Sequence, residues 1–255
     1  MPVLDGAGVV HVSLKDKAGV RSLVRAKYLV VADGAGSPTL KQLGVGTKLY
    51  AQGKVAAAFF GQKGGNVMDY DHGVARVADI DSTYTLTALP RSAEQLTGKP
   101  LEDFVRTHAG KVGIDPAATM TKSWTFDATM QHAKQLLLME DHLLVVGDAA
   151  STPHPLTGMG VNKAIYEAEL TADSIGRMLG TEDPRDRCLV ALAWKAKMHM
   201  SKESMHRQTL LLFEKFGTVR AKPSYLDDRR AKHLGTPSVS GTFKKLSAYG
   251  ARAGK

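Results

Sequence analysis

The sequence predicts an α+β fold in which strands come first and helices last. Two observations carry this prediction. Runs rich in β-branched and aromatic residues fill the first part of the chain and are separated by Gly, Asp and Ser turns. From about residue 158 onward, apolar residues recur at helical spacing instead. With 255 residues and 43% hydrophobic content, the chain can bury a full core, either as one large domain or as two small ones.

The strand-rich part begins with a predicted hairpin, residues 9–14 and 20–24, which flanks a turn at Asp16 to Gly19. A strand over residues 28–32 follows it. Such a succession of short strands favours an antiparallel sheet. The further strands that we expect cover residues 55–60, 74–80 and 83–89.

Helices are expected over residues 100–109, 158–179 and 187–216. In the last of these, Met198 and Met205 share a helix face with Trp194, so this Met- and His-rich stretch is interpreted as packing rather than metal ligation. The second helix ends at Gly180 and carries an apolar stripe formed by Val161, Ile165, Ala168, Ala172, Ile175 and Leu179.

The net charge of +9 belongs to the C-terminus. Residues 1–180 hold 18 Lys/Arg and 18 Asp/Glu, whereas residues 218–255 hold 9 and 2. We interpret this tail as a solvated extension, with peripheral contact to an anionic membrane as the alternative, and its lack of interleaved aromatic residues argues against nucleic-acid binding. The single Cys188 excludes an internal disulfide. No membrane-length apolar run or signal peptide is seen, so we expect a cytoplasmic protein.

A ligand site is predicted where the apolar run 143–146 stops at Gly147-Asp148. A loop held by prolines follows, and a helix then opens among Gly158 and Gly160. Glycines allow close approach to the backbone, and the free N–H groups of a helix N-terminus favour an electron-rich group. His154 in this loop is interpreted either as a proton donor or as a residue that shapes the turn.

A second glycine turn, Asp33-Gly34, follows the strand 28–32. It does not match a dinucleotide-binding fingerprint, because the third glycine is missing and Pro38 stands in the turn. The next strand also ends in Gly61-Gln62, where that fingerprint requires an acid.

Together the two motifs resemble those of flavin-dependent aromatic hydroxylases and related monooxygenases. Residues 31–37, continuing to Val45, resemble the family's Asp-Gly motif, and residues 147–162 resemble its Gly-Asp motif. The resemblance covers about residues 5–215. The segment from His154 to Gly158 is most similar to the branch of squalene epoxidases and ubiquinone-biosynthesis hydroxylases.

The resemblance implies an FAD site and its ligands. Asp148 would hydrogen-bond the ribitol, and the N–H groups around Gly160 to Asn162 would face the pyrimidine edge of the flavin. NADPH or NADH would be the reductant. On the strand 83–89 and in the loop, Tyr84, Leu86 and His154 are expected to contact the substrate. The expected cofactor-binding residues are Asp33, Gly34, Gly147, Asp148, Pro155, Gly158, Met159, Gly160, Val161 and Asn162.

The implied architecture is a partial FAD-dependent monooxygenase fold: an antiparallel substrate-domain sheet, the C-terminal part of the FAD-binding domain, and C-terminal helices. The expected boundaries are residues 1–45 for the region with the Asp-Gly motif, 46–135 for the strand-rich substrate domain, 136–180 for the Gly-Asp motif and its helix, 181–217 for the helical region, and 218–255 for the basic tail.

The implied activity is hydroxylation or epoxidation of a small hydrophobic substrate, aromatic, quinone-like or an alkene, through a flavin C4a-hydroperoxide. The family's glycine-rich βαβ unit has no counterpart before Tyr28. A homodimer or a companion chain is therefore expected to cover the helix 158–179. The alternatives are a non-catalytic remnant with weak or no FAD binding and a flavin-dependent reductase of isoprenoid chains.

Overall fold

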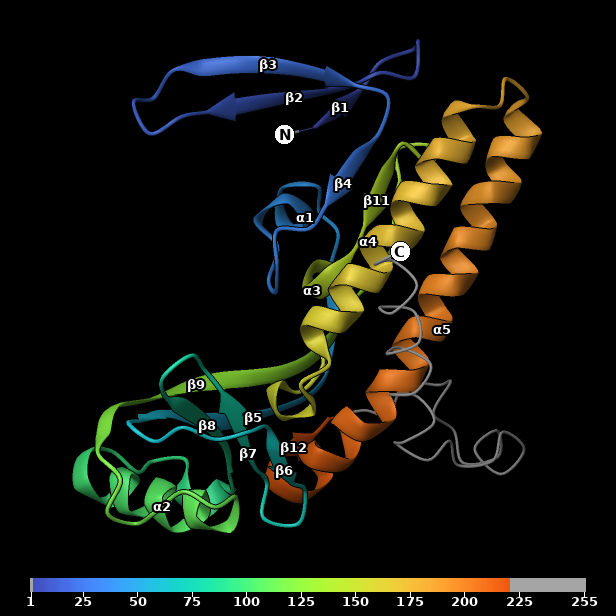
Figure 1. Cartoon of the computed structure of the whole chain (residues 1–255). Coiled ribbons are helices and arrows are strands. Elements are labelled where there is room, and N and C mark those ends of the chain that lie inside the picture. The colour runs from blue at the N-terminus through green and yellow to red at the C-terminus, as the bar shows by residue number, and fades with distance from the viewer. Residues whose placement is uncertain (1, 221–255) are drawn as a thin grey trace, which may run out of the picture. The chain divides into compact units, whose positions relative to one another are not determined.

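The strands form three sheets in the computed structural model, which describes residues 2–220 (Figure 1). The α+β class predicted from the sequence is confirmed. The first sheet contains the predicted hairpin, whose turn is closed where the Asp16 carboxylate accepts the N–H of Val20 at 2.8 Å. Its strands are antiparallel, in the order β1 (Val3–Leu4), β2 (Val10–Lys15) and β3 (Arg21–Ala26).

The second sheet is small and completely apolar along its centre. The strand β4 (Leu29–Val31) pairs in parallel with β11 (Leu143–Val145), and β10 (Leu137–Leu138) pairs antiparallel on the far side of β11. Because β11 lies in the middle, β4 is an edge strand of this sheet within the described residues. Leu143, Leu144 and Val145 are fully buried in the core that this sheet shares with the long helices.

The third sheet is antiparallel and has six strands, half of which correspond to predicted strands. The strand β5 starts at Thr47 rather than at residue 55, and the strand over 120–133 was not predicted. The helix α2 (Gly98–Lys111) packs on one face of this sheet through Leu101 and Val105. The members are β5 (Thr47–Phe60), β6 (Val67–Asp69), β7 (Val74–Ala78), β8 (Thr83–Leu89), β9 (Met120–Ala133) and β12 (Thr218–Val219).

The two long helices lie side by side (Figure 1). The helix α4 (Gly160–Leu179) starts two residues later than expected, because Gly158 ends a preceding 3₁₀ turn. The helix α5 (Pro184–Phe216) begins at an Asp183 cap. The shorter elements are α1 (Pro38–Gln42), η1 (Arg91–Ala93), α3 (Gly147–Ala150) and η2 (Pro155–Thr157). None of the described helices could cross a membrane. From residue 221 onward, the predicted basic tail lies outside the described residues.

The helix α4 is amphipathic, but its apolar side is largely exposed and its polar side is largely buried. Most of its apolar stripe is exposed: the side chains of Val161, Ile165 and Leu179 are 71%, 55% and 51% exposed, whereas Ile175 packs against the core. Four of the five buried positions on the inward face are polar or charged. One of them, the Thr171 hydroxyl, accepts a hydrogen bond from Trp194 of α5 at 2.9 Å. An exposed apolar stripe indicates a surface that contacts something besides solvent. The buried positions of α4 are Lys163, Glu167, Thr171, Ser174 and Met178.

Candidate functional site

The two motifs that the sequence singles out lie at one edge of the small parallel sheet. Asp33-Gly34 follows β4, and Gly147-Asp148 follows β11. The pairing continues one residue beyond the strands, where the Val146 N–H donates to the Val31 carbonyl at 3.0 Å. Because the strands are parallel, both loops leave from their carboxyl ends, which is where ligands bind in open α/β sheets.

Asp148 presents its carboxylate to solvent from an otherwise buried segment. Residues 143–147 and 149–152 are buried, whereas Asp148 is exposed. Within residues 2–220 its carboxylate makes no hydrogen bond. Partial burial raises the pKa of Asp148, and the positive charge of Lys163 acts against that rise. The carboxylate is therefore available to a ligand.

The N-terminus of α4 is open. Its cap residue, Met159, makes no side-chain hydrogen bond, and the first turn carries no acidic residue. Gly158 has a φ of 62°, and a Cβ at this position would meet no atom within 4 Å. The N–H groups of Gly160, Val161 and Asn162 are the first donors of this helix and carry the positive end of its dipole. This arrangement suits an electron-rich group.

His154 is 2% exposed and holds the turn before α4. Its Nδ1 accepts the N–H of Leu156 at 3.2 Å, its carbonyl accepts the Thr157 hydroxyl, and its ring packs edge-on against Phe213 at 4.6 Å. Burial lowers the pKa of His154 to about 4, so the ring is neutral near pH 7. Pro155 is the first residue of this 3₁₀ turn.

Asp33 uses its carboxylate inside its own loop. Its Oδ2 accepts the N–H of Thr39 at 3.0 Å, at the start of α1. Ser37 caps the same helix through Leu40. Gly34 has a φ of 84°, a left-handed conformation that favours glycine, and a Cβ there would meet no atom within 4 Å.

One face of the six-stranded sheet is aromatic. The rings of Phe59 and Tyr84 lie 5.7 Å apart, and those of Phe59 and Trp124 also lie 5.7 Å apart. Leu86 is on the same face, opposite Ala57. We call Phe59, Tyr84, Leu86 and Trp124 the aromatic face. All four are partly exposed, whereas Thr83, Thr85 and Thr87 on the opposite face of β8 are fully buried.

The loop between α3 and α4 connects the motif edge to the aromatic face. Thr152 pairs with the end of β9, where its N–H donates to the Gln131 carbonyl at 3.0 Å and its hydroxyl donates to the Thr129 carbonyl at 2.8 Å. A few residues later, Leu156 packs against Ala88 in a cluster that also contacts Leu86. One loop therefore fixes Asp148, the start of α4 and the aromatic face relative to one another.

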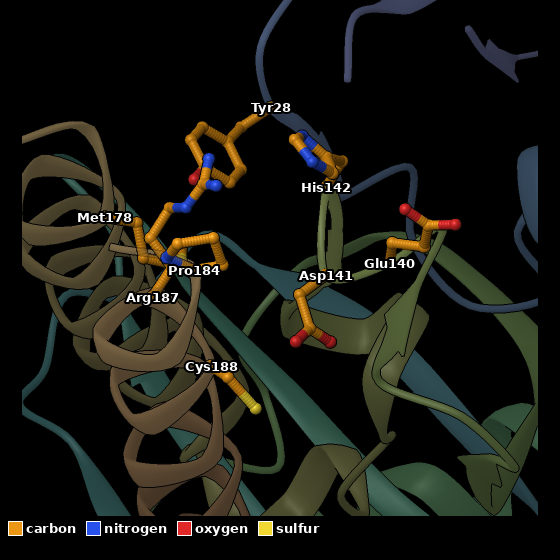
Figure 2. Close-up of a pocket in the computed structure, with 8 residues that line it drawn as sticks. All are labelled: Tyr28, Glu140, Asp141, His142, Met178, Pro184, Arg187 and Cys188. Carbon is orange, nitrogen blue, oxygen red and sulfur yellow. The ribbon is translucent and has the colours of Figure 1, made fainter. Parts of the chain in front are cut away.

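A separate cavity of about 300 Å³ lies at the other end of the parallel strands. Figure 2 shows Tyr28, which precedes β4, and His142, which precedes β11, with Arg187 and Cys188 of α5. The rings of Tyr28 and His142 stack with centroids 5.3 Å apart. The amino ends of the strands face this cavity, so it is distinct from the motif edge.

The structure supports the packing interpretation of the Met-rich stretch. Trp194, Met198 and Met205 are all buried. Among the described residues, no cluster of three His, Cys, Asp or Glu side chains could hold a metal ion.

The residues at the motif edge fit the isoalloxazine and ribityl part of a flavin. An exposed carboxylate, an uncapped helix N-terminus and a glycine with open space around it lie in one loop system. Asp148, Gly158 and the first turn of α4 could hold the cofactor. The expected cofactor residue Met159 is 4% exposed, and Gly147 is buried. These two residues could therefore contact a cofactor only through backbone atoms.

Sequence reasoning did not identify Phe59, Trp124, Lys163 or Glu167. The signal for the first two was the alternation of aromatic residues along strands. The signal for the second two was a Lys and a Glu four residues apart, on a helix whose apolar stripe lies elsewhere. Lys163 and Glu167 are completely buried in an ion pair beneath Gly147.

Known proteins resemble this chain over most of its length. Residues 3–187 match the family described as FAD binding domain. A Streptomyces halstedii protein named as a polyketide hydroxylase is 27% identical over 198 residues, which are 69% of this chain and 34% of that protein. Tetracenomycin A2 monooxygenase-dioxygenase of Streptomyces glaucescens is 25% identical over 200 residues, 69% and 35% of the two chains.

Solved structures share the fold. Anhydrotetracycline hydroxylase of Streptomyces rimosus superimposes with a TM-score of 0.56 at 19% identity, over 96% of this chain and 50% of that chain. The present chain spans about a third of the length of the curated relatives that it matches. Since the family match covers residues 3–187, which is more than half of the sequence, the chain belongs to the FAD binding domain family.

Proposed function

We propose that this chain supplies part of the FAD site and the substrate wall of a monooxygenase that acts on small aromatic or quinone-like molecules. The observation that carries the proposal is the loop 151–159, which ties the exposed Asp148 and the open start of α4 to the aromatic face. The names of the relatives, a polyketide hydroxylase and a tetracenomycin monooxygenase, support the same class of substrate.

The cofactor contacts in this proposal divide between side chain and backbone. Asp148 accepts a hydrogen bond from a ribityl hydroxyl, and the N–H groups of Gly160, Val161 and Asn162 face the pyrimidine edge. Pro155, Gly158 and Met159 shape the approach. The Asp33-Gly34 loop leaves the same edge of the parallel sheet as Gly147-Asp148. FAD supplies the redox chemistry when bound, with NADPH or NADH as its reductant.

The substrate contacts come from the sheet. Tyr84 and Leu86, with Phe59 and Trp124, offer an apolar and aromatic surface on which a planar substrate stacks. His154 acts by fixing the turn, because its Nδ1 already accepts the Leu156 N–H. In domain terms, residues 46–135 bind substrate, and residues 1–45 and 136–180 bind the cofactor.

A matched pair of glycine variants tests the cofactor site. Gly160→Val places a branched side chain at the open helix start, so we expect flavin affinity to fall below detection while the fold remains. Gly176→Val is the control, because it makes the same change on an exposed part of the same helix, with no atom within 4 Å of its Cβ. The measurement is quenching of flavin fluorescence on titration with each protein. Equal affinities of the two variants would contradict the site.

The apolar stripe of α4 favours a partner for this chain. The stripe is exposed, and β4 has an open edge with Val30 39% exposed within the described residues. We propose that a companion chain, or a second copy of this chain, covers this surface and completes the cofactor site. A chain that binds no FAD even with its partner would be the non-catalytic remnant.

Sedimentation equilibrium tests the partner proposal. The wild-type chain is expected to self-associate or to sediment with a companion, and the double variant Val161→Ser/Ile165→Ser should weaken that association. The control is Glu169→Gln, an exposed residue of α4 outside the stripe. A monomeric wild-type chain that binds no hydrophobic dye would overturn the proposal.

A further inference from the structure

A completely buried ion pair lies directly behind the Gly-Asp motif. Lys163 and Glu167 are one turn apart on α4, with 2.9 Å between Nζ and Oε2, and both side chains are 0% exposed. Removing two charges from water is costly, and well-packed apolar residues often stabilise a fold as well as a buried pair does. The pair therefore calls for a role other than stability.

Both members of the pair bind the backbone of Gly147. The Gly147 N–H donates to Glu167 Oε2 at 2.8 Å, and Lys163 Nζ donates to the Gly147 carbonyl at 2.9 Å. These are charge-assisted hydrogen bonds, which are shorter and stronger than neutral ones. Gly147 has a φ of 59°, so the contacts hold a left-handed conformation at the residue before Asp148.

The helix α5 fixes the carboxylate of Glu167 from the other side. The Ser201 hydroxyl donates to Glu167 Oε1 at 3.3 Å. The Thr171 hydroxyl donates to the Glu167 carbonyl, and Trp194 of α5 donates to that hydroxyl. The orientation of the pair is thus set by the packing of α4 on α5.

Lys163 also acts on the motif through its charge. It is the positive group that opposes the rise in the pKa of Asp148 on burial. A single side chain therefore holds the Gly147 carbonyl and favours the ionised form of the neighbouring carboxylate.

We propose that Lys163 and Glu167 are positioning residues that clamp Gly147 and so aim the Asp148 carboxylate at its ligand. That the ligand is a flavin rests on the proposed function. The clamp itself concerns only residues of this chain.

Two double variants separate the clamp from an ordinary ion pair. Lys163→Met/Glu167→Met removes both charges of the pair together, so neither member is left buried without the other. The buried Lys202, whose charge Glu167 attracts, is kept in both double variants. Lys163→Glu/Glu167→Lys keeps an ion pair but puts an acceptor beside the Gly147 carbonyl and a donor beside its N–H. Glu169→Gln, exposed on the same helix, is the control.

Two measurements need no flavin. Amide hydrogen exchange at Gly147 should become faster by about tenfold or more in both double variants. Carboxyl NMR titration should show a higher pKa for Asp148 in the Met variant, which lacks the Lys163 charge. Flavin affinity, measured on the same proteins, should fall by about tenfold or more in both. The control should match the wild type throughout.

The outcomes distinguish the two proposals. Folded double variants with unchanged exchange at Gly147 and unchanged titration of Asp148 would overturn the clamp, whatever their flavin affinity. A swapped variant that behaves like the wild type would also overturn it, because only an ion pair would then be needed. If exchange and titration change as expected but the wild type binds no flavin, the clamp is supported and the proposed function fails.

Discussion

The loops after β4 and β11 resemble each other in sequence but use their carboxylates differently. Asp33 accepts the Thr39 N–H, whereas Asp148 is exposed and makes no hydrogen bond within residues 2–220. Burial would raise the pKa of Asp33, but hydrogen bonds from Ser37 and Thr39 outweigh it and lower that pKa. Burial raises the pKa of Asp148. An aspartate next to a glycine therefore builds the first loop and is left available to a ligand in the second.

Low pH should destabilise the surroundings of the second loop more than those of the first, because buried histidines lie around the second loop. Burial lowers the pKa of His132 to about 3, with Lys202 and Lys163 contributing, and that of His154 to about 4. Below pH 6.5 the unfolded chain takes up protons that the folded chain does not, so stability falls as the pH drops. By pH 4 the loss is about 3 kcal/mol for each histidine.

Urea unfolding between pH 7 and pH 4 measures this loss. His132→Phe keeps an aromatic ring beside Tyr50 and should remove part of the pH dependence. A free energy of unfolding that stays constant over this range would show that these histidines are not held neutral.

Alanine at Asp148 should separate binding from stability. Because the carboxylate is exposed and unbonded within residues 2–220, Asp148→Ala is expected to leave the melting temperature unchanged. Flavin binding should weaken by about 1.5–3 kcal/mol, since a charge-assisted hydrogen bond to the cofactor is lost. Fluorescence titration and a thermal melt on one sample measure both quantities. An unchanged affinity would remove Asp148 from the site.

The same change at Asp33 should have the opposite pattern. Asp33→Ala removes the acceptor for the Thr39 N–H and should cost about 1 kcal/mol of stability, as expected for the loss of one hydrogen bond. Its effect on flavin affinity should be smaller than that of Asp148→Ala. Denaturant unfolding measures the stability. Were Asp33→Ala to abolish binding without destabilising the fold, the contrast between the loops would be wrong.

The sequence predicted which segments are strands or helices better than it predicted which strands pair. The hairpin, the strand 83–89 and the long helices were predicted from local patterns of apolar residues and turn residues. The strand 120–133 was not, although Trp124, Phe126, Ala128 and Met130 alternate with polar residues in its middle. The parallel pairing of β4 with β11 joins residues more than a hundred positions apart, and local patterns do not encode such a contact.

The sequence predicted the loop that forms the site but not the buried ion pair that holds this loop. Glycines and an acid at the end of an apolar run marked the Gly147-Asp148 loop, because such residues have few other uses there. The ion pair behind it was not predicted, since an (i, i+4) Lys and Glu usually mark a solvated helix face. On α4 the polar face is buried and the apolar stripe is exposed, so the normal inference from amphipathicity fails.

The exposed stripe of α4 also has a consequence for the life of the protein in the cell. Chaperones and proteases act on the fraction of a protein that is unfolded, and a difference of about 1–2 kcal/mol in stability changes steady-state abundance several-fold. Val161, Ile165 and Leu179 present an exposed apolar stripe in a helix that is otherwise well anchored. If a contact that covers this stripe stabilises the chain by that amount, we expect the steady-state amount of the protein to rise with the covering contact and to fall when Val161 and Ile165 no longer form it.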